Sequence, residues 1–430
     1  MMAEAAPGLR ALPHAVFLER LAGAPNASSS EARLGRAAFV ALRLVDLLGH
    51  DREALHADAF HYQHVATERA CRELPADRTE TTHLVGIVAS AADALRADAN
   101  SLVLPALFAY AHYLEDEMRL EQALDVLETM RHISADELSS PDSTAMRLRT
   151  ARVLRKLNQF DAAERSYEET RALATASGDT HSELLSRIGR ANVLTARGNL
   201  AESERALRGV FADAETLGDR EAQALGHHGL AVVLSTGGRP ADAVLHAWRA
   251  FELYSDDLAR MRALGDVGTM LLLVGDAESA TRALTEVVRR GATHDVLDNA
   301  TIALMDCASF RRDRVGFERW RERCQARQSS MPPNILATFH LEVAIGRARL
   351  GQLDRAEEAL AMALSVASSA GLHELEFRIE RIKGGLRDCL TKPACSIESI
   401  AEYAHESDAV REVSASLARF DDNASRTAPL

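Results

Sequence analysis

The sequence predicts an all-α fold made of about seven copies of one helical hairpin, and three observations carry this prediction. Small residues recur along the middle of the chain in steps of 40, 40, 40 and 37 residues, followed by a gap of 76 that fits two steps. A second series of small residues follows the first by 12 residues. A segment typical of a tight turn separates the two series in each copy. The first series is Ala111, Ala151, Ala191, Ala231, Gly268 and Ala344, and the second is Ala123, Ala163, Ser203, Ala243, Ala280 and Ala356.

Each copy therefore contains a helix A, a turn and a helix B. The turn begins with Gly198, Gly238, Gly275 or Gly351, or with Asn158, as a left-handed helix C-cap requires, because a missing or short side chain avoids the steric penalty. Acidic residues follow within a few positions, where they suit the free N–H donors of a new helix. Leucines at i, i+3 and i+4 spacing from the small residues place one apolar face on each helix.

These residues resemble the tetratricopeptide repeat family, whose pattern places a small residue in mid helix A, Gly before the turn and Ala early in helix B. The resemblance covers roughly residues 101–390. The period is longer than the standard 34 residues, and in this it is similar to maltose-regulator-type and Rap-like bacterial arrays. The resemblance implies a right-handed α-solenoid superhelix with the A helices along a concave side. HEAT and armadillo arrays share the period, but they usually lack the small-residue pair and the Gly turn.

The chain outside the repeats is expected to be helical as well. Helices are predicted near 13–22, 31–49, 51–73 and 79–97, so that residues 1–100 form an N-terminal helical region or cap. Residues 101–390 form the solenoid, and 391–430 a capping helix and a disordered tail that starts at Asp421. One copy, between residues 299 and 336, departs from the pattern, because Asp313–Phe317 offers no clean turn.

Composition narrows the class of protein. A formal net charge of −13 argues against nucleic acid as the partner, since phosphate binding needs a concentrated basic face. No apolar run reaches the roughly 18 residues of a membrane-spanning helix, and the start of the chain lacks the apolar stretch of a signal peptide. Five cysteines without framework spacing favour reduced thiols. A cytoplasmic protein is expected.

The sequence gives little support to a catalytic function. The sequence contains no Gly-rich phosphate loop, no GxSxG elbow and no HExxH pattern, and no cofactor is predicted. His56, Asp58, His61 and His64 fall within one predicted helix, where His61 and His64 could share a face as metal ligands do. The alternative is a polar helix that is rich in histidine, and this interpretation is preferred, so no metal site is predicted.

The predicted binding surface lies on the A helices. In tetratricopeptide arrays the residues one and four positions after the mid-helix small residue tend to face the groove, which here gives Arg152, Arg155, Asn192 and Thr195, with His228 following in the next copy. Asn can bond a peptide backbone, and Arg can hold a carboxylate through two contacts. Residues 142–157 carry a local charge of +4. The alternative is an ordinary solvated face whose arginines pair with acidic residues of helix B, namely Glu164, Glu168 or Glu169.

The preferred function is a non-enzymatic adaptor or scaffold that binds a protein or peptide segment, acidic or carboxylate-terminated, in the concave groove. A peptide-sensing regulator, whose superhelix changes curvature when the ligand binds, is the alternative that the Rap-like and maltose-regulator resemblance implies. A metal-dependent enzyme that uses the N-terminal histidines is the weakest alternative. Neither nucleic acid nor membrane is expected as a partner.

Overall fold

The computed structural model describes residues 12–22, 26, 28–49, 57–133, 140–391 and 407–427. Every regular element in these residues is a helix, and the chain divides into two compact units, Met1–Gly189 and Arg190–Leu430. None of the helices in the described ranges is long and apolar enough to cross a membrane. The predicted all-α class is confirmed. The predicted division into 1–100, 101–390 and 391–430 stays a prediction.

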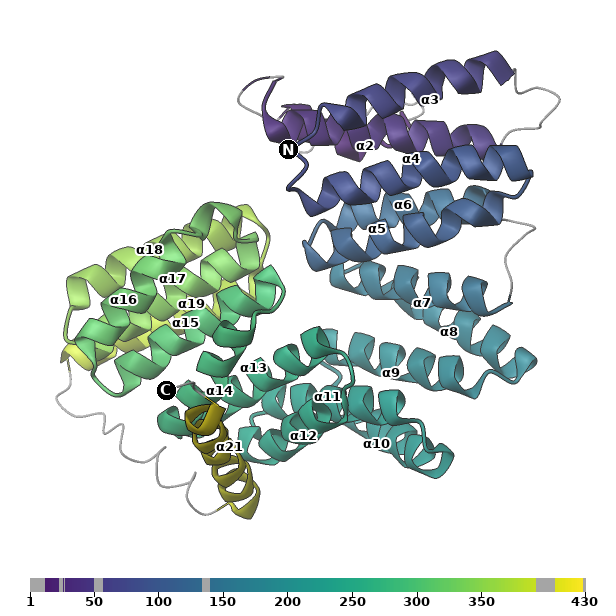
Figure 1. The fold of residues 1–430 in the computed structure, drawn as a ribbon. Coiled ribbons are helices and arrows are strands. Elements are labelled where there is room, and N and C mark those ends of the chain that lie inside the picture. Colours follow the sequence, from purple (N-terminus) through teal and green to yellow (C-terminus); the bar gives the residue numbers. More distant parts are fainter. Residues whose placement is uncertain are drawn as a thin grey trace. The chain divides into compact units, whose positions relative to one another are not determined.

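The first unit begins with a group of helices that precede the repeats. Figure 1 shows α2, α3 and α4 next to α5 and α6, and one hydrophobic core runs through this part of the chain from Phe17 to Val153. Its helices are α1 (Ala15–Ala22), α2 (Ser30–Asp46), α3 (Ala57–Arg72), α4 (Thr79–Ala97), α5 (Leu104–Asp116), α6 (Leu120–Ile133), α7 (Ser140–Lys156) and α8 (Phe160–Ser177).

The second unit starts within α9 (Thr180–Ala196). It continues with α10 (Leu200–Leu217), α11 (Arg220–Thr236), α12 (Pro240–Leu253), α13 (Asp257–Leu273), α14 (Ala277–Arg290), α15 (His294–Phe310), α16 (Arg314–Gln325), α17 (Pro333–Arg349), α18 (Leu353–Ser369), α19 (His373–Thr391) and α21 (Asp408–Thr427). From Leu104 to Ser369 the described helices pair into seven hairpins, α5/α6 through α17/α18, as the repeat count predicted. In each hairpin the odd-numbered helix is helix A.

The small residues lie where the two helices of a hairpin meet. All five alanines of the first series and all six members of the second are fully buried. At Gly268 an added Cβ atom would lie 2.6 Å from Cγ of Leu284 on the B helix of the same hairpin, a distance that real contacts do not reach. The hydroxyl of Ser203 donates a hydrogen bond of 2.7 Å to the carbonyl of Ala191. The two series of small residues therefore lie at the contact between helix A and helix B in six of the seven hairpins.

The turns follow the predicted chemistry, with one correction. Gly198 and Gly238 have φ of 79° and 77°, in the left-handed region that a side chain disfavours. The irregular copy was expected to lack a clean turn, and this expectation is wrong. Arg312 takes the left-handed position with φ of 58°, and the Asp313 carboxylate accepts a hydrogen bond from the Gly316 N–H, which caps α16. Arg312 thus takes the position that glycine holds in other turns, and Asp313 caps the helix that follows.

The C-terminal helix packs on the side of the second unit. Figure 1 shows α21 beside α12 and α14, and its Val410, Val413 and Leu417 are buried. The Ser414 hydroxyl donates to the Asp276 carboxylate at 2.7 Å, and Arg249 lies 3.3 Å from Glu412. Residues 396–406 of the predicted closing helix lie outside the described residues. The helix ends at Thr427, although a tail was expected from Asp421.

Candidate functional site

Arg152 lies in a cluster of cations around one buried carboxylate in the first unit. Glu115 of α5 is fully buried, and its carboxylate is 2.6 Å from Arg152 Nε, 2.8 Å from Lys156 Nζ and 2.5 Å from Arg149 Nη1. Burial by itself raises the pKa of Glu115, but the three cations of α7 outweigh burial and hold that pKa well below its usual range. Much of the positive charge predicted at 142–157 is therefore committed to the preceding A helix.

The remaining arginines of α7 contact α8. The Arg155 guanidinium lies beside the hydroxyl of Tyr167; burial raises the pKa of this tyrosine and Arg155 opposes the shift. Arg147 forms an exposed ion pair of 3.2 Å with Glu169, one of the three acidic partners that the alternative interpretation named. The arginine-rich face is thus in part a paired surface, while Arg152 keeps a side chain that is 37% exposed.

Asn192 and Thr195 belong to the second unit and differ in what they contact. The hydroxyl of Thr195 lies 2.7 Å from Ser203 Oγ and donates to the Ala191 carbonyl, so it takes part in the contact between α9 and α10. The Asn192 side chain instead lies toward α11, where its Oδ1 atom would be 3.4 Å from a Cβ added at Gly229. Its amide is half-buried and has no hydrogen-bond partner among the described residues.

His228 follows on α11, one residue before Gly229, and links two successive A helices. Its Nε2 atom is 2.7 Å from the Asp266 carboxylate of α13, and its Nδ1 atom is 3.0 Å from the Tyr254 hydroxyl. The structure therefore brings two predicted residues, Asn192 and His228, onto neighbouring helices. It holds Thr195 within its own hairpin, and it places Arg152 and Arg155 in the other unit.

Exposed apolar side chains accompany this ion pair. Val232 stands four residues after His228 on α11 and is 40% exposed, and Leu273 stands seven residues after Asp266 on α13 and is 52% exposed. This spacing puts each of them on the same helix face as the ion pair. We call the set Asn192, His228, Val232, Asp266 and Leu273 the A-helix strip. Sequence reasoning missed Asp266, Val232 and Leu273. The position one residue after the small residue Ala231 could have indicated Val232.

Two further ion pairs join A helices later in the second unit. Arg349 of α17 pairs with Asp306 of α15 and stacks over the Phe310 ring, and Arg378 of α19 lies 3.3 Å from Glu342 of α17. Burial and the nearby Asp306 raise the pKa of Glu342 to about 7, although the two arginines oppose this shift. Ion pairs between successive odd-numbered helices thus recur at α11/α13, α15/α17 and α17/α19, where α19 follows the last hairpin.

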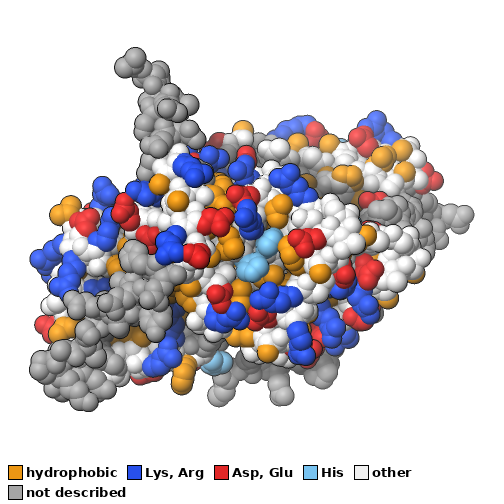
Figure 2. Space-filling view, turned by 90° about the horizontal axis from the view of Figure 1, so that it is seen from below, with side chains coloured by type: hydrophobic (Ala, Val, Ile, Leu, Met, Phe, Trp, Pro, Cys, Tyr) orange, Lys and Arg blue, Asp and Glu red, His pale blue; other side chains and the backbone are white. Residues whose placement is uncertain are grey.

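The histidines of α3 do not assemble a metal centre within the described residues, in which no group of three or more His, Cys, Asp and Glu is arranged to hold a metal. His56 lies outside those residues, as does the side chain of Asp58, and the ring of His64 stacks on Phe60. Figure 2 shows Lys and Arg interleaved with Asp and Glu across the face in view. That face lacks the single-sign positive field that phosphate backbones require.

Comparisons with known proteins show which solved structures share this architecture. No family model and no curated protein sequence matches the chain. A Rap protein complexed with competence and sporulation factor is similar in structure, with a TM-score of 0.52 and 10% identity over 80% of this chain and 99% of that chain. The Rap conjugation gene regulator of plasmid pLS20, in complex with the Phr peptide, has a TM-score of 0.53 and 12% identity, over 81% of this chain and 96% of that chain. The apo form of the quorum sensor NprR from B. thuringiensis has a TM-score of 0.51 and 10% identity, over 78% of this chain and 98% of that chain. At these identities the likeness shows the fold alone, and the predicted all-α solenoid of helical hairpins is confirmed.

Proposed function

We propose that this chain is a non-enzymatic, cytoplasmic binding protein that holds a peptide or an extended protein segment on the A-helix strip of its second unit. The observation that carries the proposal is the unpartnered amide of Asn192 beside the His228–Asp266 ion pair. An asparagine amide can accept from one backbone N–H and donate to one backbone C=O, so it recognises a peptide bond of any sequence.

The rest of the strip suits the side chains of such a ligand. Val232 and Leu273 expose aliphatic surface next to charged groups, which is the mixture that a bound peptide with alternating apolar and polar side chains would cover. Covering each aliphatic side chain contributes about 1–2 kcal/mol. The solved Rap proteins that share the fold are in complex with competence and sporulation factor and with the Phr peptide, which supports the same class of ligand here.

For the first unit, taken by itself, we propose a separate contact with an acidic group at Arg152. Glu115 neutralises one of the three cations that surround it, and Arg152 still exposes 37% of its side chain. An acidic side chain or a terminal carboxylate bound at this unit would complete the charge balance around Glu115. Charge reversal at Arg152 is a poor test, however, because it would set a second carboxylate against buried Glu115. Lowered affinity could then reflect a disturbed fold.

The experiment is a selection of random heptapeptides on the full chain, followed by titration of the selected peptides by fluorescence anisotropy. Asn192→Ala is expected to weaken the dissociation constant by about 5–30-fold, because one or two hydrogen bonds are lost. Asn199→Ala is the matched control, since this asparagine of the same hairpin pairs with Glu202 in the turn, away from the strip. Leu273→Glu should weaken binding through the apolar contact.

Two results would contradict the proposal. If the selection yields no peptide that binds saturably, a peptide is not the ligand of this chain. Peptides that bind Asn192→Ala, Asn199→Ala and Leu273→Glu with the affinity of the natural chain would show that the A-helix strip is not the binding site.

A peptide-sensing regulator is the second candidate, and the recurrent ion pairs between A helices favour it. A ligand that competes for His228 or Asp266 would loosen the link between α11 and α13 and so change the spacing of the hairpins. Small-angle scattering with and without a selected peptide distinguishes the candidates. A changed radius of gyration supports the regulator, whereas an unchanged scattering curve with a saturated site supports the adaptor.

A further inference from the structure

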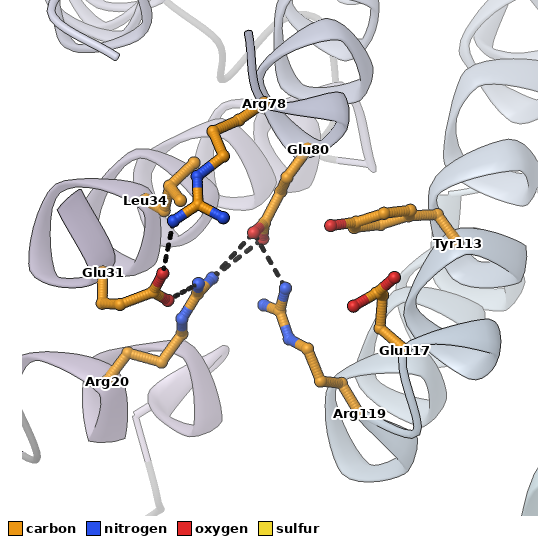
Figure 3. Close-up of a pocket in the computed structure, with 8 residues that line it drawn as sticks. All are labelled: Arg20, Glu31, Leu34, Arg78, Glu80, Tyr113, Glu117 and Arg119. Atoms are coloured by element: carbon orange, nitrogen blue, oxygen red, sulfur yellow. Dashed lines mark hydrogen bonds and ion pairs between the residues drawn. The ribbon is translucent and has the colours of Figure 1, made fainter. Parts of the chain in front are cut away.

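A pocket of about 150 Å³ lies among the N-terminal helices of the first unit, apart from the A-helix strip. Figure 3 shows its lining residues, which converge from α1, α2, α4 and the end of α5. They comprise three guanidinium groups, three carboxylates, one phenol and one aliphatic side chain: Arg20, Arg78, Arg119, Glu31, Glu80, Glu117, Tyr113 and Leu34. At roughly 30 Å³ per water, the space accommodates a molecule of about five to seven heavy atoms.

Glu80 organises one wall of this pocket, and its own bonding capacity is filled. The side chain is only 3% exposed, and its two oxygens accept from Arg20 at 2.9 and 3.0 Å, from the Tyr110 hydroxyl at 2.9 Å and from Arg119 at 2.9 Å. Burial raises the pKa of Glu80, but Arg119 and Arg20 outweigh burial and lower it. Glu80 therefore stays ionised and fixes both guanidiniums in place.

Two hydrogen-bond donors at the pocket lack acceptors in the described part of the chain. Arg119 directs Nη1 to Glu80 and Nε to Gln122, but its Nη2 atom is buried without a partner. The Tyr113 hydroxyl, which Figure 3 shows pointing toward the gap beside Glu80, has no partner either. Arg119 Nη2 is the buried one of the two, and an unmet buried donor costs about 1–3 kcal/mol, whereas Tyr113 is half-buried. A ligand with acceptor oxygens, such as a carboxylate, would satisfy both.

The charges around the pocket restrict the ligand further. Three arginines and three glutamates leave the lining with no net charge, so a free dianion such as phosphate would meet Glu31 and Glu117 unfavourably. A carboxylate that carries its own ammonium group matches a neutral lining, with the ammonium directed to the carboxylate side. We infer that this pocket binds a small zwitterion, a free α-amino acid, through its carboxylate on Arg119 Nη2 and the Tyr113 hydroxyl and its ammonium toward Glu117.

The test is isothermal titration of the full chain with each of the twenty amino acids, with acetate and with inorganic phosphate. A small amino acid is expected to bind saturably in the micromolar to millimolar range, with acetate and phosphate at least about tenfold weaker. Tyr113→Phe removes only the hydroxyl and is expected to weaken binding about fivefold to tenfold, and Glu117→Gln should weaken it similarly. Tyr62→Phe, at a tyrosine that is 77% exposed on α3, is the matched control and should bind normally.

Arg119 itself is a poor target, because its loss would leave Glu80 buried with fewer cations and could unfold this region. The substitutions at Tyr113 and Glu117 avoid the Glu80 hydrogen bonds, and circular dichroism melts would verify that both variants fold. Failure of every amino acid to bind would overturn the inference, as would binding that Tyr113→Phe and Glu117→Gln leave unchanged. Preference for phosphate or acetate over every amino acid would overturn it as well.

Discussion

Replacing Glu115 by glutamine tests whether one buried carboxylate holds the first repeats together. The substitution preserves the shape of the side chain and removes its charge. Three cations of α7 would then lose their shared partner, and two of them have little access to water: the Arg149 side chain is 17% exposed and Lys156 19%. Arginine cannot escape by losing its proton, and Arg149 is also packed over the Phe108 ring. The contact between α5 and α7 should therefore weaken strongly.

The magnitude follows from the burial of these groups. Breaking a buried ion pair by removal of one partner costs about 3–5 kcal/mol, because the remaining charge is desolvated without compensation. Arg152 is 37% exposed and can turn toward solvent, and glutamine still offers one acceptor oxygen. We therefore expect Glu115→Gln to lower the free energy of unfolding by about 3 kcal/mol. The matched control is Glu169→Gln, whose 62% exposed side chain pairs with Arg147 and whose loss should cost less than about 0.5 kcal/mol.

The assay is urea unfolding at neutral pH followed by circular dichroism, together with hydrogen exchange to assign the loss to α5 and α7. The pKa of Glu115 is lowered by folding, so its contribution is complete above the unfolded value of about 4.3 and is lost as pH falls. The difference between the natural chain and Glu115→Gln should accordingly shrink in acid. A loss below about 1 kcal/mol, or equal losses in both variants, would refute the reasoning.

Three further predictions concern other parts of the chain. Burial lowers the pKa of His14, but its hydrogen bonds to Asp125 and Asp46 outweigh burial and raise that pKa to about 9. His14 should therefore contribute about 3 kcal/mol of stability below pH 6.5, which is lost as pH rises through 9. His14→Gln should flatten that dependence on pH in unfolding titrations. Burial and the neighbouring His246 lower the pKa of His227 to about 4, so the free energy of unfolding should fall as pH drops from 6.5 toward 4. His227→Gln should remove about 1 kcal/mol of this loss in acid. An unchanged dependence of stability on pH would contradict the assignment. Val413→Asp should release α21 from α12 and α14 at a cost of about 2 kcal/mol or more. The release would be measured as lost hydrogen-exchange protection in residues 408–427. Retained protection would show that this contact does not hold the helix.

The hairpin pattern was readable from the sequence because the features that create it are local. Each turn needs a residue that tolerates positive φ, and each A/B contact needs a small side chain at a fixed offset, so both appear as periodic residues. The irregular copy shows the limit of this reasoning. Arg312 occupies the left-handed position there, and the Asp313 cap supports the turn, so the absence of glycine was misleading.

The candidate site was predictable only in part. Asn192 and His228 were found because their distance from the small residues places them on the A helices. Thr195 has the same register as Arg155, yet its hydroxyl contacts Ser203 of its own hairpin. Spacing along one helix identifies a face, but it does not identify which neighbouring helix that face meets.

The sequence by itself determined the repeat, the helices and the turns, because these depend on residues within about 12 positions of one another. Only the tertiary structure decided which charges neutralise which. Glu115 meets cations that stand 34 to 41 positions later, Glu80 meets Arg20 and Arg119 from opposite directions along the chain, and His14 reaches Asp125. Such pairs leave no periodic trace, since burial and the packing of separate helices, and not local spacing, select them.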